Sequence, residues 1–275
     1  MSIKTPRRAR TLLLLVACAL SASSLAAHEL FLKLATYFLP AETPVRVLLL
    51  NGTFSKSEGV VARDRIADIA LVGPGGRGSL DTSAVSAQHD TTVLRLRTAG
   101  EGTYVLGVSV RPREIALTGE QFNGYLKEEG IDDMLAERTR TGMLGEAAKE
   151  RYAKHVKAIF QVGGARSAGY STVLGYAAEL IPLENPYELK RGGTLRFRCL
   201  INGQAAAGLT VLAGGVTSRG AAIRGVRVRS DSAGVAELPF TSAGRWYVKF
   251  ISMRHSTVPG ITHESQWATL TFEVR

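Results

Sequence analysis

The sequence predicts a mainly β protein of two β-sandwich domains with a helical insertion between them. Apolar residues alternate with polar or small residues in several short segments between positions 45 and 110, a pattern typical of half-buried antiparallel strands. A helical pattern begins after Pro112, and the alternation returns after Gly163-Gly164. We therefore place a first β domain at 28–112, a helical insertion at 113–165 and a second β domain at 166–275.

The first domain is predicted from strands separated by turn signals. An apolar, β-branched segment at 45–50 ends at Asn51-Gly52, which favours a turn. The glycine-rich segment 73–78 is typical of a loop. Segments 94–97 and 104–110 alternate with a period of two, so each should expose one face and bury the other.

The insertion is predicted to contain three helices. Thr118 with Gln121 forms a capping box, and Gly130 is placed to end the helix that this box begins. A second helix should start near Asp132. A third is expected at about 145–161, with four residues on its apolar face: Ala148, Tyr152, Val156 and Ile159.

The second domain shows the clearest alternation. In segment 195–201, arginines alternate with apolar residues, which points Cys199 inward as a small hydrophobic side chain. Asp231 to Gly234 matches a type I turn. Long strands are expected at 246–253 and 267–275, and short antiparallel strands with glycine-rich turns favour a sandwich.

Residues 1–27 are predicted to be a secretory signal peptide. Four basic residues precede an unbroken apolar run from Leu12 to Leu20, which is too short to span a membrane, and small residues follow it. Small residues at positions −3 and −1 favour cleavage after Ala26. Cleavage after Ala27 is the alternative and leaves His28 as the first residue. Leu15 to Cys18 also resembles a lipobox, which would make Cys18 a lipidated residue. We expect a periplasmic protein, with the lipoprotein as the minor alternative.

Charge and cysteine content restrict the function classes. Removal of the leader lowers the net charge from +10 to +6 and leaves Cys199 as the remaining cysteine, so no intrachain disulfide is expected. The basic residues are scattered and not interleaved with aromatic residues, which argues against nucleic-acid binding. No transmembrane segment is expected in the mature chain.

Several segments together resemble a bacterial family of exported proteins catalogued as a domain of unknown function, number 4198. They are AHELFLK, LLNGTFSKSE, EGTYVL, FNGYLKEEGIDD, AKERYAKHVKAIFQVGG, GYAAELIPLENPYEL and ESQWATLTFEV. Members were formerly labelled periplasmic components of cobalt or nickel transport. The resemblance implies a role in handling such metals.

The last third of the chain resembles the prealbumin-like fold of carboxypeptidase regulatory domains. The segments that carry this likeness are GQAAAGLTVLAGG and SDSAGVAELPFTSAGRWYVKF. It implies a prealbumin-like sandwich for the second β domain, and we expect both β domains to be immunoglobulin- or prealbumin-like sandwiches. The domain-of-unknown-function family named above often has a histidine in a triplet after the tryptophan strand. This chain has Ile251-Ser252-Met253 there, and His255 follows two residues later.

Four residues are candidate metal ligands: His28, His255, His263 and Glu264. An amino-terminal histidine offers an α-amine and an imidazole to one ion, and nitrogen donors suit Cu(II), Ni(II) or Zn(II). We expect the other three in the segment joining the last two strands. There the geometry allows them to meet His28, although a polar surface loop is the simpler explanation. His263 and Glu264 should point in different directions, so one of them at most would bind the metal directly.

No sequence motif indicates an enzyme. HExxH, CxxC, GxSxG and P-loop patterns do not occur, and the acidic pairs near 128–133 fit helix capping. We therefore predict a non-enzymatic periplasmic protein that captures nickel, cobalt or copper for uptake or homeostasis. A metal uptake transporter or another envelope protein would be its partner. The main alternative is an interaction or structural module that binds an envelope protein or glycan, and the third hypothesis is a metal-dependent enzyme built on His28.

Overall fold

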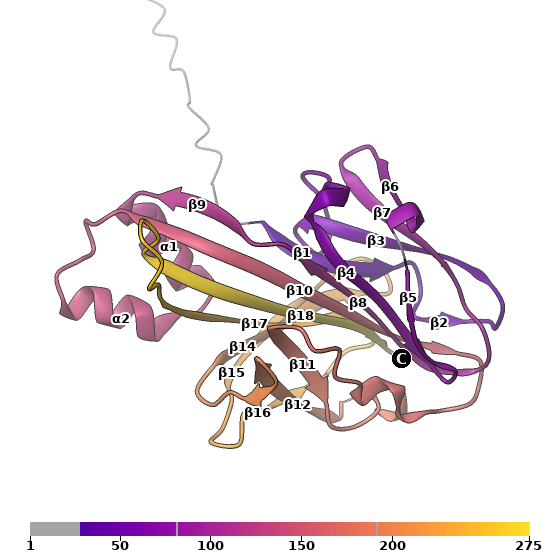
Figure 1. Ribbon diagram of the computed structural model, residues 1–275. Helices are drawn as coiled ribbons and strands as arrows, with labels where there is room; N and C mark the ends of the chain where they lie inside the picture. Colours follow the sequence, from indigo (N-terminus) through magenta and orange to yellow (C-terminus); the bar gives the residue numbers. More distant parts are fainter. Residues whose placement is uncertain (1–27, 81, 191) are drawn as a thin grey trace, which may run out of the picture.

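The computed structural model describes residues 28–80, 82–190 and 192–275 of the chain (Figure 1). The predicted signal peptide, its cleavage point and the lipidation alternative at Cys18 lie outside the described residues.

The fold is mainly β, as predicted, and a long mixed sheet forms its centre. Neighbouring strands of this sheet are hydrogen-bonded in the order β15 (Ala222–Arg229), β14 (Thr210–Thr217), β17 (Gly244–His255), β18 (His263–Val274), β10 (Ala148–Val162), β8 (Gly102–Val110), β4 (Ile66–Gly73) and β5 (Gly76–Ser79), and β2 (Phe38–Leu39) and β9 (Arg113–Leu117) also pair with β10.

Two smaller sheets complete the described part of the fold. One has the order β1 (Glu29–Leu34), β3 (Pro44–Gly52), β7 (Thr91–Arg97) and β6 (Val85–Gln88). In the other, β12 (Thr194–Ile201) pairs with β11 (Ala178–Pro182), β13 (Gln204–Ala205) and β16 (Val235–Pro239). Short 3₁₀ turns lie at Arg63–Arg65, Thr82–Ala84, Ala168–Ser171 and Pro186–Glu188.

The two smaller sheets cover opposite faces of the central sheet at β10 and β18 (Figure 1). On one face, the Thr271 hydroxyl donates to the Leu32 carbonyl of β1 at 2.6 Å. On the other face, the Phe272 ring packs against Phe197 and Phe240 of the β11–β12 side. Both layers share one hydrophobic core, so strand β18 is buried on its two faces.

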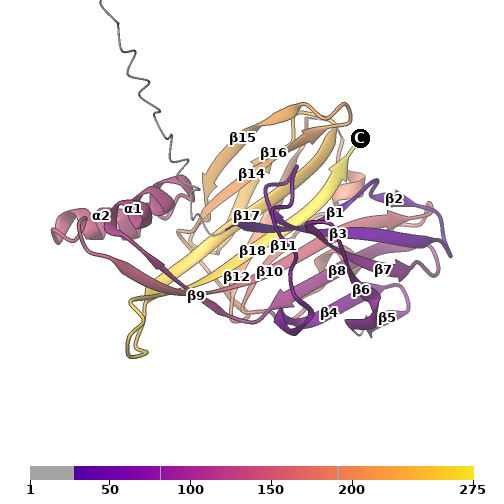
Figure 2. The same cartoon turned by 90° about the horizontal axis from the view of Figure 1, so that it is seen from above.

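The helices α1 (Gly119–Glu128) and α2 (Asp132–Arg140) lie at one end of the long strands, and the last residue lies at the other end (Figure 2). The predicted capping box is confirmed, because Thr118 accepts from the Gln121 backbone and Gln121 accepts from the Thr118 backbone. Gly130 follows α1 with a φ of 73°, as expected for a terminating glycine. Phe122 and Leu126 of α1 pack with Trp267 of β18.

The predicted third helix at 145–161 is wrong, since these residues form the long strand β10. From Ala153 to Val162 every residue of this strand is buried, because sheets cover both of its faces. A strand buried on both faces has no period-two alternation to reveal it. Its charged residues made the segment resemble an amphipathic helix, but Lys157 and Glu150 are buried.

The predicted insertion is therefore helical only at its centre. Its ends supply β9 and the whole of β10, and the central sheet takes strands from all three predicted segments. The division of the chain into independently folding units stays a prediction. Cys199 is buried as expected, and burial raises its pKa to about 12.

Candidate functional site

A pocket of about 310 Å³ lies beside His28, the first described residue. It is bordered by β1, the turn after β3, helix α1 and strand β17. Four carboxylates and four aromatic side chains take part in its lining, which comprises His28, Glu29, Phe31, Gly52, Thr53, Phe54, Glu58, Tyr125, Glu128, Glu129 and Tyr247. The concentration of carboxylates makes this corner of a basic protein locally acidic.

His28 faces a carboxylate across the mouth of the pocket. Its Nδ1 atom lies 3.0 Å from Glu58 Oε2, and the two side chains are 44% and 40% exposed. The turn after β3 brings Glu58 back to this position, and its N–H donates to the Asn51 carbonyl at 2.8 Å. Gly52 allows the turn, since a Cβ there would lie 2.6 Å from the Lys56 carbonyl oxygen.

Two buried lysines hold the backbone that carries His28. Lys249 of β17 forms ion pairs with Glu29 and with Glu129, the latter at 2.6 Å. Lys154 of β10 donates to the His28 carbonyl and lies 4.2 Å from the centre of the Trp267 ring. The start of β1 is therefore tied to the central sheet and, through Glu129, to the end of α1.

The lysines and carboxylates of this corner have shifted pKa values. Burial lowers the pKa of Lys154 to about 8, against the attraction of Glu29 and Glu129. Burial acts in the same direction on Lys249, but the attraction of Glu29 and Glu129 outweighs it and raises the Lys249 pKa. Burial also raises the pKa of Glu29, although Lys249 opposes this. Lys249 therefore stays charged as the counter-ion of the two glutamates.

Segments far apart in the sequence converge here. The segment at 27–33 supplies His28 and Glu29, that at 49–58 supplies Glu58, and that at 122–133 supplies Tyr125 and Glu129. Lys154 and Trp267 come from the segments at 148–164 and 264–274, and Lys249 comes from the segment with the prealbumin-like likeness. Most of the segments on which the family resemblance rests thus meet at this one corner.

The predicted histidines of the last hairpin lie elsewhere. His255 and His263 were expected in the segment that connects the last two strands. The structure instead places them opposite each other, at the end of β17 and the start of β18. Their ring centroids are 5.1 Å apart. Lys249, which binds Glu29, precedes His255 by six residues, which corresponds to about 20 Å along a strand. The expected meeting of His28 with these histidines is therefore absent from the structure.

The hairpin residues have other partners. His255 Nε2 lies 3.1 Å from Glu137 Oε1 of α2, and Glu264 forms an ion pair with Arg254. His263 is buried and Glu264 is only partly exposed, and they point in different directions as predicted. His263 Nδ1 lies 2.7 Å from the Thr262 hydroxyl, whose own proton goes to the Lys149 carbonyl. This bond places the histidine proton on Nδ1 and leaves Nε2 as an acceptor.

His263 Nε2 has no hydrogen-bond partner within the described part of the chain, and the same is true of Glu150 Oε2. Glu150 and His263 are register partners of the parallel β10–β18 pair, so their side chains share one face. Burial, together with the charge of His255, lowers the pKa of His263 to about 4. Burial raises the pKa of Glu150. Both shifts favour the uncharged form of the group.

Side chains alone do not form a metal centre among residues 28–80, 82–190 and 192–275, where no three His, Cys, Asp or Glu residues are grouped to hold an ion. The donor set that fits best at His28 therefore depends on an α-amine created by cleavage after Ala27. Within the described residues, no helix has the length and apolar character to cross a membrane.

Comparison with known proteins gives a family but no activity. No curated protein matches the chain. Among solved structures, trypsin-activated α2-macroglobulin from Escherichia coli matches with 11% identity and a TM-score of 0.21, over 90% of this chain and 16% of that chain. A two-domain fibronectin type III segment of chicken tenascin matches with 11% identity and a TM-score of 0.22, over 90% of this chain and 98% of that chain. The BSP domain of a biofilm-associated protein matches with 10% identity and a TM-score of 0.19, over 88% of this chain and 29% of that chain.

The family model described as "Domain of unknown function (DUF4198)" matches residues 25–254, which is most of the chain. The segments of the sequence that resembled this family lie mainly within the matched range. The chain belongs to the DUF4198 family.

Proposed function

We propose that this protein is a periplasmic transition-metal-binding protein that holds one ion at His28. The observation that supports this proposal is the 3.0 Å approach of His28 Nδ1 to Glu58 Oε2 at the mouth of an acidic pocket. In an amino-terminal histidine, Nδ1 and the α-amine are the two atoms that close a six-membered chelate ring on one metal. Glu58 thus lies beside the nitrogen that such a chelate requires.

The donor types restrict the metal. Two nitrogen donors and one carboxylate suit Cu(II), Ni(II) or Co(II), and copper binds most tightly in the ordinary order of affinities. The neighbouring carboxylate Glu128 adds negative charge that favours a cation, whereas Glu129 is paired with Lys249. Because His28 and Glu58 are both partly exposed, an ion held there could pass directly to a partner such as an uptake transporter.

The backbone of the site is supported independently of the metal. Lys154 fixes the His28 carbonyl and Lys249 fixes the Glu29 side chain, so the amino terminus leaves the fold at a defined point. Positioned ligands lose less conformational entropy when they bind an ion. The proposed role is capture and transfer, and no catalytic step is assigned to the site.

Calorimetric titration of the exported chain with CuCl₂ and NiCl₂ tests the proposal. We expect one ion per chain, abolition of binding by His28→Ala, and a loss of about tenfold in affinity for Glu58→Gln. His255→Asn is a matched control, because His255 also pairs with an exposed glutamate, at 3.1 Å, but carries no terminal amine. It should bind as the unmodified chain does.

The absence of heat with every divalent ion would remove the metal proposal. The protein would then be left as an interaction or structural module of the cell envelope, whose partner would be a protein or glycan. Binding that survives His28→Ala but is lost in His255→Asn would move the site to the last hairpin.

A further inference from the structure

A second cavity lies beyond the last residue of strand β10, whereas His28 contacts Lys154 near the middle of this strand. Its volume is about 530 Å³, within the range of small-molecule sites, and it is lined by Phe38, Leu39, Gly163, Arg166, Pro186, Tyr187, Leu189, Glu273 and Arg275. Gly163 follows Lys154 by nine residues, which corresponds to about 30 Å of strand. The cavity is therefore separate from the His28 pocket.

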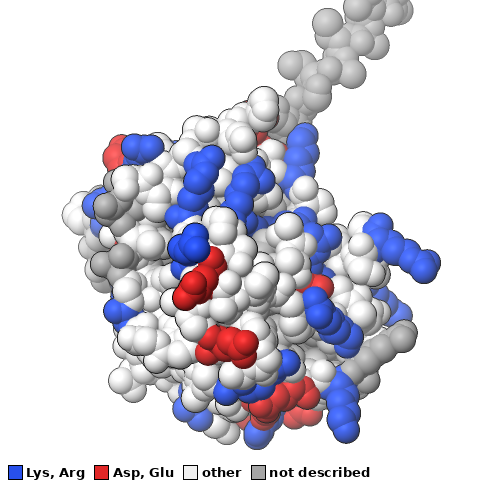
Figure 3. Space-filling view, turned by 90° about the vertical axis from the view of Figure 1, so that its right-hand side faces the viewer, with Lys and Arg blue, Asp and Glu red and all other residues white. Residues whose placement is uncertain are grey.

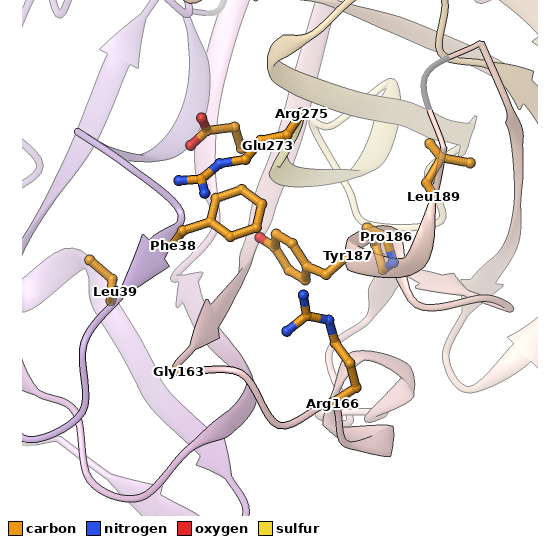
Figure 4. Close-up of a pocket in the computed structure, with 9 residues that line it drawn as sticks. All are labelled: Phe38, Leu39, Gly163, Arg166, Pro186, Tyr187, Leu189, Glu273 and Arg275. Carbon is orange, nitrogen blue, oxygen red and sulfur yellow. The ribbon is translucent and has the colours of Figure 1, made fainter.

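Two guanidinium groups flank the aromatic rings of this cavity (Figure 4). Arg275 lies over the Phe38 ring, 3.5 Å from its centre. Arg166 approaches from the other side and donates to the Gly164 carbonyl at 3.1 Å. Within the described residues neither arginine forms an ion pair with a carboxylate, so both keep donors for a ligand.

The carboxylate side chain in the lining is already engaged. Glu273 Oε2 accepts from the Tyr37 N–H at 2.9 Å and lies 3.5 Å from the Thr36 hydroxyl. The lining side chains therefore carry two positive charges and one negative charge, and the negative one is turned toward the backbone of the β1–β2 connection. The face of the molecule at this end carries many Lys and Arg side chains, while its acidic side chains gather in a few places (Figure 3).

The aromatic walls are fixed in position. The Tyr187 hydroxyl donates to the Ile159 carbonyl at 2.5 Å, so the ring of Tyr187, not its hydroxyl, is available to the cavity. Phe38 packs edge-on against this ring with the centroids 5.0 Å apart. The pairing of β2 with β10 holds Phe38 and Leu39. The accessible surface of the cavity is mainly polar, and these rings with the neighbouring aliphatic side chains form its smaller apolar part, which is fixed in position.

We propose that this cavity binds a small organic anion. Its carboxylate or phosphate group would pair with Arg166 or Arg275, with the second guanidinium group adding positive charge nearby, and its planar or apolar body would pack against Phe38 and Tyr187. Guanidinium groups form strong charge-assisted hydrogen bonds with both kinds of anion. Two arginines that approach from separate segments select for the charged group, while the apolar wall selects against a bare inorganic ion.

Isothermal titration and amide chemical-shift mapping of the exported chain with benzoate, phenyl phosphate and inorganic phosphate test the site. We expect one of the two aromatic anions to bind, with the shifts centred on Phe38, Gly163 and Tyr187, and inorganic phosphate to bind more weakly. Arg166→Gln and Arg275→Gln should each weaken the aromatic anion about tenfold. Arg224→Gln, on the exposed strand β15, is the control and should leave the affinity unchanged.

The comparison of benzoate with phenyl phosphate identifies which anionic group the site prefers. Absence of shifts at the cavity with either aromatic anion would overturn the proposal. So would equal affinities in the unmodified chain and in the double variant Arg166→Gln, Arg275→Gln. Inorganic phosphate that binds as tightly as phenyl phosphate would refute the role of the aromatic wall.

Discussion

Two histidine–glutamate pairs in this molecule look alike but differ in their surroundings. His28 approaches Glu58 at 3.0 Å and His255 approaches Glu137 at 3.1 Å, with all four side chains partly or largely exposed. The His28 pair lies at a pocket, on backbone fixed by two buried lysines. The His255 pair lies on an exposed hairpin end, where its neighbour is the buried and neutral ring of His263.

The difference teaches that an imidazole beside a carboxylate does not by itself indicate a metal site. The histidine–glutamate distances of the two pairs are almost equal, so distance does not distinguish a metal site from an ordinary ion pair. The two pairs differ in whether the histidine has a second nitrogen ligand for a metal and whether its backbone is fixed. In the proposed mature chain, His28 has both. The predictions below test whether these surroundings matter, from the largest expected effect to the smallest.

The largest effect is expected from Lys249→Met at the His28 corner. This substitution leaves Glu29 and Glu129 close together without their shared counter-ion. The free energy of unfolding should fall by about 3–4 kcal/mol, as is usual when one partner of a buried ion pair is removed. Urea denaturation at neutral pH measures it. Adding Glu129→Gln should recover part of the loss, and no recovery would contradict an electrostatic cause.

The next effect concerns pH and the hairpin. Folding lowers the pKa of His263 from 6.5 to about 4, so the unfolded chain binds the proton more tightly between these values. His263 therefore stabilises the fold above about pH 6.5, and this contribution is lost as the pH falls toward 4. We expect the contribution of His263 to the free energy of unfolding to be about 2 kcal/mol. This is less than the full pKa shift would give, because His263 lies at a strand end beside the exposed His255.

Urea denaturation of the unmodified chain and of His263→Asn, between pH 4 and pH 7, measures this contribution. The pKa values of Glu150 and Glu29 are raised, so these groups change the unfolding free energy with pH in the opposite direction. Subtracting the unfolding free energy of the variant from that of the unmodified chain cancels their contribution. A difference that does not change with pH would show that His263 is not held neutral by the fold.

A smaller effect is expected when the backbone of His28 loses its anchor. Lys154→Met removes the donor to the His28 carbonyl. The Cu(II) affinity of the proposed site should fall about tenfold, as for other residues that orient ligands. Hydrogen exchange of the first β1 amides should become faster. Lys149→Met, which removes an exposed ion pair with Glu114, is the control for both measurements. Equal effects of the two substitutions would contradict the anchoring role.

The smallest effect is expected from the exposed ion pair of the hairpin. Arg254 is largely exposed where it meets Glu264, so Arg254→Met should cost less than about 1 kcal/mol of unfolding free energy. A loss comparable to that of Lys249→Met would mean that the two corners do not differ in how strongly their charges support the fold.

Much of the β structure could be predicted because many strands have one buried and one exposed face. Segments such as β12 alternate clearly, and the capping box of α1 is a local signal. β10 could not be predicted in this way, since its two-sided burial depends on sheets formed by distant segments.

The candidate site could be predicted only at His28, whose position after the predicted leader is a local feature. Glu58, Lys154 and Lys249 were missed because they reach His28 from separate strands and turns. Lys249 in fact carried a signal. It stands between Val248 and Phe250 in an apolar strand, and a lysine in that setting needs a buried counter-ion.

The most direct test of metal binding at His28 compares two forms of the mature chain, one that starts at His28 and one that retains Ala27 with an acetylated amino terminus. The second form keeps every side chain but has no free amine that could bind an ion together with the imidazole. Competition for Cu(II) with a chromogenic chelator measures both affinities. We expect the form that starts at His28 to bind at least about a hundredfold more tightly, because its two nitrogens act as one chelate. Equal affinities of the two forms would contradict coordination by the amino-terminal histidine.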